Sequence, residues 1–129
     1  MKQIFVRLAE AKDAETFDAW VKNAQDINLF DPGVMAYPTT KTLVAHNGEP
    51  LVYMPVQTTL TMESLAPKPD IAPIDEALAL RELTKTVAFM ASQLGVKEIY
   101  FLCKDDRVVK FAEAHGYEKL PWTTMRMKV

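Results

Sequence analysis

Residues 74–94 carry the longest helical pattern in the chain, and this pattern limits the possible folds most strongly. Six apolar side chains recur there at helical spacing and form one stripe: Leu80, Leu83, Val87, Met90, Ala91 and Leu94. Gly95 follows the run and suits the left-handed position that ends a helix. β-Rich sequence precedes the helix, and an apolar run at 97–103 follows it. This order predicts a helix that crosses between two strands, and therefore a mixed α/β fold.

The N-terminal half predicts a strand, a helix and a hairpin. Residues 3–9 alternate as a strand does, and Asp13 is a candidate N-cap for the helix that follows. The apolar stripe of that helix consists of Phe17, Trp20, Val21 and Ala24. The dipeptide Asn47-Gly48 separates two β-rich runs and tolerates the positive φ of a tight turn, which predicts a hairpin. Pro55 indicates a bend, an edge or a bulge in the second run.

Several connections and later elements complete the expected fold. Residues 26–40 predict a partly helical connection with a turn at 31–33. Whether the second hairpin strand continues to residue 65 as one strand or two stays open. The remaining predicted elements are an extended linker set by Pro67, Pro69 and Pro73, a helix at 106–115 that stops at Gly116, and a strand at 122–129. Together they predict a central mixed sheet flanked by helices in a single domain, residues 1–129.

Length and composition exclude several classes of protein. The chain has 129 residues, enough for one domain with a core, and its formal net charge of −2 creates no field that would gather nucleic acid or anionic membrane. Cys103 is the one cysteine and cannot form an intramolecular disulfide. No segment has the pattern of a secretion signal or a bilayer span. We therefore expect a soluble cytoplasmic protein without nucleic-acid or membrane partners.

Three successive segments carry a resemblance to a known family. They are Leu94-Gly95-Val96-Lys97-Glu98-Ile99-Tyr100-Phe101-Leu102, then residues 105–111, then Ala114-His115-Gly116-Tyr117-Glu118-Lys119-Leu120. This succession resembles the second half of the GNAT-type N-acyltransferases, over about residues 60–120, and the earlier elements fit the family's order. The brevity of the chain and the run at 64–67 also resemble small GNAT-like proteins encoded by bacteriophages. The resemblance implies a GNAT-like sheet, acetyl-CoA as acyl donor and an amine as acceptor.

The family's pyrophosphate loop has no counterpart here. Members of the family hold the pyrophosphate of acyl-CoA with a Gln/Arg-x-x-Gly-x-Gly/Ala loop at the start of the long helix, where backbone N–H groups meet the anion. The equivalent stretch, residues 68–76, contains no glycine and three carboxylates. Lys68 and Arg81 are the cations that can offset them, and Asp70 or Asp75 is a candidate helix cap. The four glycines, Gly33, Gly48, Gly95 and Gly116, all lie at expected turns or helix ends. We therefore expect weak or rearranged CoA binding.

The tyrosine that donates a proton during acyl transfer in the family is also missing at the matching position of this chain. The family's proton-donating tyrosine corresponds to Ala112, and Tyr117 stands where the family usually has Phe, which favours a packed aromatic ring. Tyr53 and Tyr100 can replace that tyrosine as proton donors only if the fold directs their side chains into the acyl-transfer cleft. If the chain is active, the main chain of 63–65, with Ser64 and Leu65, resembles the strand that pairs with the pantetheine arm. Candidate bases are then Glu63, Glu49 and His46.

Other chemistry has little support in the sequence. His46 and His115 lie where histidines are more often structural, and Asp105-Asp106 is explained by a helix cap and an acidic first turn. No serine lies in a nucleophile motif, and Cys103 is expected to be a buried, inert thiol. We therefore expect no metal site and no nucleophilic triad.

Two hypotheses about function follow from these observations. The leading one is a GNAT-like domain in which acyl transfer is degenerate or lost, with a binding or assembly role in a phage particle or a phage-infected cell. Its candidate surfaces for a protein partner or a homo-oligomer are Leu78, Phe89, Trp122 and the proline-rich linker, although Leu78 and Phe89 better suit a second packing contact within the domain. The alternative is an active N-acetyltransferase with a rearranged pyrophosphate loop at 66–76.

Overall fold

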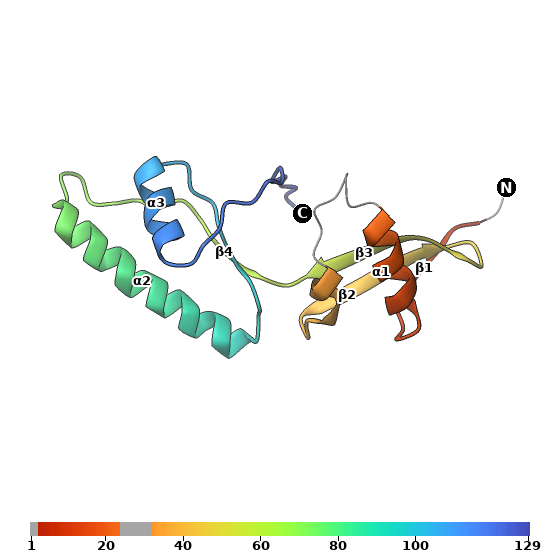
Figure 1. Ribbon diagram of the computed structural model, residues 1–129. Helices are drawn as coiled ribbons and strands as arrows, with labels where there is room; N and C mark the ends of the chain where they lie inside the picture. The colour runs from red at the N-terminus through yellow and green to blue at the C-terminus, as the bar shows by residue number, and fades with distance from the viewer. Residues whose placement is uncertain (1–2, 24–31) are drawn as a thin grey trace.

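The computed structural model describes residues 3–23 and 32–129. In chain order, the elements are β1 (Phe5–Leu8), α1 (Asp13–Asn23), the 3-10 helix η1 (Pro32–Ala36), β2 (Thr40–His46), β3 (Pro50–Gln57), β4 (Leu60–Met62), α2 (Pro73–Leu94), β5 (Ile99–Phe101) and α3 (Asp106–Ala114). Figure 1 shows an elongated arrangement, with α1 over the sheet of β1, β2 and β3 at one end and α2 with α3 at the other. The mixed α/β class expected from the sequence is confirmed.

The antiparallel sheet has the order β1-β2-β3 and contains the expected hairpin. Thr40 pairs with Gln57 and Val44 with Tyr53, and the register shifts after Ala45. Gly48 takes a φ of 104°, which costs a residue without Cβ little. The turn is also fixed by polar contacts, because the Glu49 N–H donates to the Asn47 side chain at 3.4 Å.

The segment that begins with the second hairpin strand forms two strands, β3 and β4, which belong to different sheets. β3 is an edge strand, which accommodates Pro55, and it ends at Gln57. After Thr58 and Thr59 the chain continues as β4, which pairs in parallel with β5. The strands therefore form two sheets instead of one central sheet, although both antiparallel and parallel pairing occur. β5, expected as an interior strand over 97–103, is three residues long, and β4 is its neighbour in this two-stranded sheet.

Helix α2 has the expected length, but only half of its apolar stripe is covered. Gly95 ends the helix at a φ of 70°, with its N–H directed to the Ala91 and Ser92 carbonyls. Leu80 and Val87 are half-buried and Ala91 is buried. The outer half of the stripe is exposed and consists of Leu83, Met90 and Leu94.

The last elements confirm one expectation and overturn another. Asp105 caps α3 by accepting from the Arg107 N–H at 2.8 Å, as the Asp105-Asp106 pair predicted. The strand expected at 122–129 is wrong, because the structure contains no ladder there and the side chain of Met125 is 88% exposed. Alternation alone was the basis of that prediction, and a strand also needs a neighbour that supplies hydrogen bonds.

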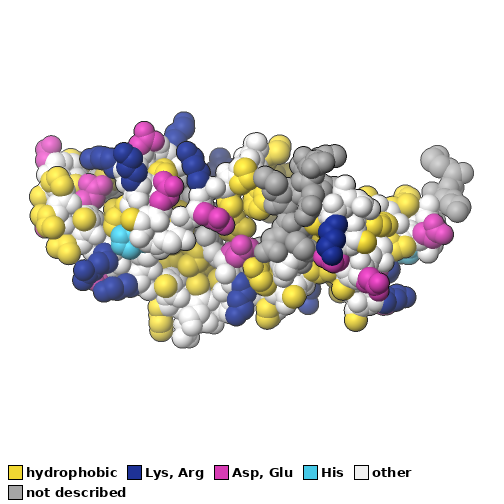
Figure 2. All heavy atoms as spheres, viewed as in Figure 1, with side chains coloured by type: hydrophobic (Ala, Val, Ile, Leu, Met, Phe, Trp, Pro, Cys, Tyr) yellow, Lys and Arg dark blue, Asp and Glu magenta, His cyan; other side chains and the backbone are white. Residues whose placement is uncertain are grey.

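The buried core is small for a chain of this mass. Among the described residues it consists of Phe17, Val44, Ala91, Val96, Val108 and Ala112, divided between the two ends of the molecule. The accessible surface is 10426 Å², whereas a compact monomer of 14.6 kDa exposes about 6,900 Å². Figure 2 shows hydrophobic side chains on the visible surface at both ends. Much apolar surface is therefore left in contact with water.

Candidate functional site

The N-terminal end of α2, where the resemblance implies a pyrophosphate site, has no side-chain cap. Ala72 is the N-cap residue with extended backbone, and Pro73 opens the first turn. The expected cap by Asp70 or Asp75 is therefore wrong. Asp70 instead takes a φ of 60° in the turn before the helix, where the Ile71 N–H donates to the Lys68 carbonyl at 3.2 Å. Asparagine and aspartate tolerate this left-handed geometry better than most residues, which explains the turn.

Charges at this helix end disfavour a diphosphate. Asp75 and Glu76 lie in the first turn of α2, where they interact favourably with the positive end of the helix dipole. Lys68 is exposed. Arg81 lies about 12 Å along the axis from Pro73 at 1.5 Å per residue, and its Nε is 3.8 Å from the Glu82 carboxylate. The two cations expected to offset the carboxylates are therefore exposed, and Arg81 already has an acidic neighbour.

The carboxyl ends of β4 and β5 are held together by the chain itself. The Leu102 N–H donates to the Met62 carbonyl at 2.9 Å, and the Ser64 hydroxyl donates to the Leu102 carbonyl at 3.3 Å. Ser64, a candidate cofactor-binding residue, is thus engaged with β5. Leu65 is 38% exposed. These bonds occupy backbone groups beside the segment 63–65 that the resemblance implies for the pantetheine arm.

Glu63, one of the two candidate catalytic residues, does not line the cavity that Tyr117, the other, lines. Glu63 is exposed. Tyr117 lines a cavity of about 660 Å³ among α2, β5, α3 and the C-terminal segment, and Glu63 is absent from its lining. The Tyr117 ring packs edge-on against Phe101 with centroids 6.3 Å apart, and burial raises the pKa of its hydroxyl. The ring contact with Phe101 is what the interpretation of Tyr117 as a packed aromatic residue predicts.

Both histidines make local contacts, and the cysteine is more accessible than expected. The Gly48 N–H donates to His46 Nδ1 at 3.4 Å, within the hairpin turn. His115 stacks on Phe111 at 4.1 Å between centroids, with its Nδ1 2.8 Å from the Phe111 carbonyl oxygen. Cys103, expected to be buried, is half-buried. Glu49, the third candidate base, is exposed in the hairpin turn.

An aromatic cavity of about 650 Å³ lies between α1, η1, β3 and β5, and the sequence did not reveal it. Five aromatic residues that bear a hydroxyl or an indole line it: Trp20, Tyr37, Tyr53, Tyr100 and Trp122. Tyr53 and Tyr100, the tyrosines considered as substitute proton donors, both line this cavity. They come from strands in different sheets, and for this reason periodicity within either strand could not place them together.

Tyr53 belongs to a network around the buried carboxylate of Asp13. Arg7 makes two bonds to this carboxylate, at 2.8 and 3.0 Å, and the Tyr53 hydroxyl donates to it at 2.9 Å. The Glu10 N–H also donates, at 2.8 Å, so the side chain of Asp13 reaches back across the first turn. Hydrogen bonding to Arg7 holds the pKa of Asp13 far below its usual range. Burial and the bond to Asp13 raise the pKa of Tyr53.

The charge of the cavity comes from Glu98. It is the one ionisable acid or base, apart from tyrosine, among the described residues of the lining. The Tyr100 hydroxyl donates to Glu98 Oε1 at 3.5 Å, and burial together with Glu98 raises the pKa of Tyr100. The Nε2 atom of Gln57 is buried in the described structure without a hydrogen-bond partner. Neutral tyrosines, one carboxylate and one amide can bind a polar ligand, but both tyrosine hydroxyls are poor proton donors near neutral pH.

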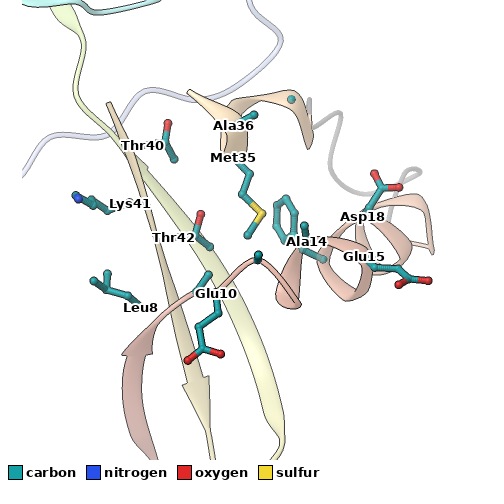
Figure 3. Close-up of a pocket in the computed structure, with 14 residues that line it drawn as sticks. Leu8, Glu10, Ala14, Glu15, Asp18, Met35, Ala36, Thr40, Lys41 and Thr42 are labelled. Atoms are coloured by element: carbon teal, nitrogen blue, oxygen red, sulfur yellow. The ribbon is translucent and has the colours of Figure 1, made fainter. Parts of the chain in front are cut away.

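A second groove, of about 820 Å³, lies between α1, η1 and β2. Figure 3 shows Met35 of η1 pointing into the space between α1 and β2, whereas Leu8 and Lys41 point away from α1. Three acidic side chains line the α1 side: Glu10, Glu15 and Asp18. Because carboxylates raise the cost of placing an anion nearby, this groove is also unsuited to the phosphates of CoA.

Comparisons with known proteins identify no family for this chain. No model of a known protein family matches the chain, and no curated protein matches it. Within residues 3–23 and 32–129, no cluster of three His, Cys, Asp or Glu side chains is placed to hold a metal ion. In the same described part of the chain, no helix combines the length and apolar character needed to cross a bilayer.

Proposed function

We propose that this chain is a GNAT-like domain that has lost acyl transfer and acts by binding or assembly, in a phage particle or a phage-infected cell. The observation that carries the proposal is the N-terminal end of α2. Pro73 has no N–H to offer, and Asp75 and Glu76 place two carboxylates where an anion would bind. Each carboxylate near a diphosphate costs on the order of 1 kcal/mol, and 1.4 kcal/mol is a tenfold change in affinity.

Two further observations support the same proposal. The bonds from Leu102 to Met62 and from Ser64 to Leu102 join β4 and β5 at their carboxyl ends. Ala112, at the position of the family's proton-donating tyrosine, is buried in α3 and has no proton to give. The residues present therefore do not fit acetyl-CoA.

An active N-acetyltransferase is the second candidate, and one observation favours it. Tyr53, Tyr100 and Glu98 line a single cavity, so hydroxyls and a carboxylate do converge. This function requires acetyl-CoA to bind by contacts other than those of a glycine-rich loop, since the loop at 66–76 would have to rearrange. Within the cavity, the raised pKa values of Tyr53 and Tyr100 make both residues weak acids.

Thermal unfolding with and without excess acetyl-CoA distinguishes the two candidates. A ligand at one hundred times its dissociation constant stabilises the folded state by about 2.7 kcal/mol. The proposal predicts an unchanged melting temperature for the wild type. A clear rise would contradict it. A matched variant, Pro73→Ala with Asp75→Asn and Glu76→Gln, removes the obstacles at α2 and should respond to acetyl-CoA more strongly than the wild type.

A further inference from the structure

The antiparallel sheet has a bare apolar face opposite α1. Register places Arg7, Val44 and Tyr53 on the face that α1 covers. Because side chains alternate along a strand, their neighbours lie on the other face. Figure 3 agrees, since Leu8 and Lys41 point away from α1. The other face carries Val6, Leu8, Leu43, Ala45, Val52, Met54 and Val56, with Lys41 at one corner.

This face is exposed on its two outer strands, β1 and β3, whereas Leu43 and Ala45 of the central strand β2 are half-buried. Val6 is 65% exposed on β1, and Met54 and Val56 are 54% and 48% exposed on β3. A sheet with an apolar face requires a second layer, which in α/β proteins is a helix. We call this surface the bare sheet face.

A surface of similar length lies on α2 of the same chain. The outer half of its stripe is exposed at Leu83, Met90 and Leu94, by 54%, 47% and 61%. From Leu83 to Leu94 the helix rises about 16 Å, and from Val52 to Val56 the strand extends about 13 Å. These three residues are called the outer stripe of α2. Its length therefore suits the bare sheet face.

Within one chain the two surfaces are far apart. Figure 1 shows α2 at the opposite end of the molecule from β1, β2 and β3. β4 and β5 hold the α2 end of the chain, and the step from β3 to β4 is tied down because the Thr58 N–H donates to the Thr39 carbonyl at 3.0 Å. The outer stripe of a second copy can contact the bare sheet face without any change in the structure of either chain.

The unburied area has the size that such a dimer needs. The accessible surface of 10426 Å² exceeds the value for a compact monomer by about 3,500 Å². A standard interface covers about 800 Å² per partner, and obligate homodimers cover more. In a dimer with two-fold symmetry, α2 of each copy would pack on the sheet of the other copy. The interface would then contain two identical helix–sheet contacts.

From these observations we propose that the chain forms a symmetric dimer in which the outer stripe of α2 from each copy packs on the bare sheet face of the other. The partner is a second copy of this chain. The proposal does not involve the α2 N-terminus, and Val52 is the one residue named on the bare sheet face that also lines the aromatic cavity. It stands independently of whether acetyl-CoA binds. It also differs from the earlier candidate surfaces, since Leu78 and Phe89 lie on another side of α2.

Sedimentation equilibrium tests the proposal on the full chain. The wild type should have twice the chain mass of 14.6 kDa. Met54→Glu on the sheet and Met90→Glu on the helix should each yield monomers. Phe89→Glu is the matched control, because Phe89 is the neighbour of Met90, is 64% exposed and faces away from the outer stripe, and this variant should remain dimeric. A monomeric wild type would overturn the proposal.

Cross-linking provides a second test that does not depend on disrupting the dimer. In a Cys103→Ala background, chains with Met54→Cys and chains with Met90→Cys are unfolded together, refolded and oxidised. The mixture should give a disulfide-linked dimer that neither variant gives alone. A dimeric mass with no mixed cross-link would contradict this pairing of surfaces and point to another interface.

Discussion

The Asp13→Asn substitution tests the network that joins α1 to the sheet. The carboxylate of Asp13 is 4% exposed and accepts bonds from Arg7, Tyr53 and the Glu10 N–H. Asparagine keeps the shape but turns an amide NH₂ toward groups that are themselves donors, and it removes the negative charge opposite Arg7. Breaking a buried ion pair costs about 3–5 kcal/mol, and Arg7 keeps some access to water.

We therefore expect a loss near the lower bound, about 3 kcal/mol, which for a chain of this length lowers the melting temperature by about 10 °C. Urea unfolding followed by tryptophan fluorescence measures this, since the Trp20 ring lies 5.1 Å from Tyr53. Asp18→Asn is the control. It removes an exposed pair with Lys22 at 3.0 Å and should cost under about 1 kcal/mol. Equal losses in the two variants would refute the assigned role of Asp13.

Three further predictions concern single contacts and pH. In the folded chain the pKa of Asp13 lies below its ordinary value of 3.8. As the pH falls, Asp13 is therefore protonated first in the unfolded chain, which favours unfolding. The wild type should therefore lose stability as the pH falls below about 4, and Asp13→Asn should lose less over the same range by urea unfolding. Tyr53→Phe removes the bond to Asp13 and should cost about 1 kcal/mol of unfolding free energy, with a smaller loss in the Asp13→Asn background. Asp105→Ala removes the cap of α3 and should also cost about 1 kcal/mol, which Asp106→Ala should not reproduce, and calorimetry measures both.

Local signals were sufficient for the elements whose geometry is set by neighbouring residues. The Asn47-Gly48 turn, the Asp105 cap and the Gly95 stop each follow from backbone requirements within a few residues, and the structure contains all three. The same logic failed at Asp13. This residue was expected to cap α1, but its carboxylate reaches back to Glu10 and across to Arg7.

Features that depend on distant residues could not be predicted from the chain. The division into two sheets depends on whether β4 pairs with β5 or continues beside β2, and periodicity is the same in both cases. The strand expected at 122–129 failed because no neighbouring strand accepts its hydrogen bonds. Tyr53 and Tyr100 meet in one cavity only because the two sheets lie next to each other there.

Titration of the isotopically labelled protein with acetyl-CoA, followed by amide NMR shifts, tests the central claim most directly. The amides of Ile74, Asp75 and Glu76 report on the exact place where the resemblance implies a diphosphate. We predict no saturable shift at these amides, because Pro73 and the two carboxylates disfavour the anion. Saturable shifts centred on residues 68–76 would contradict the account and favour an active acyltransferase.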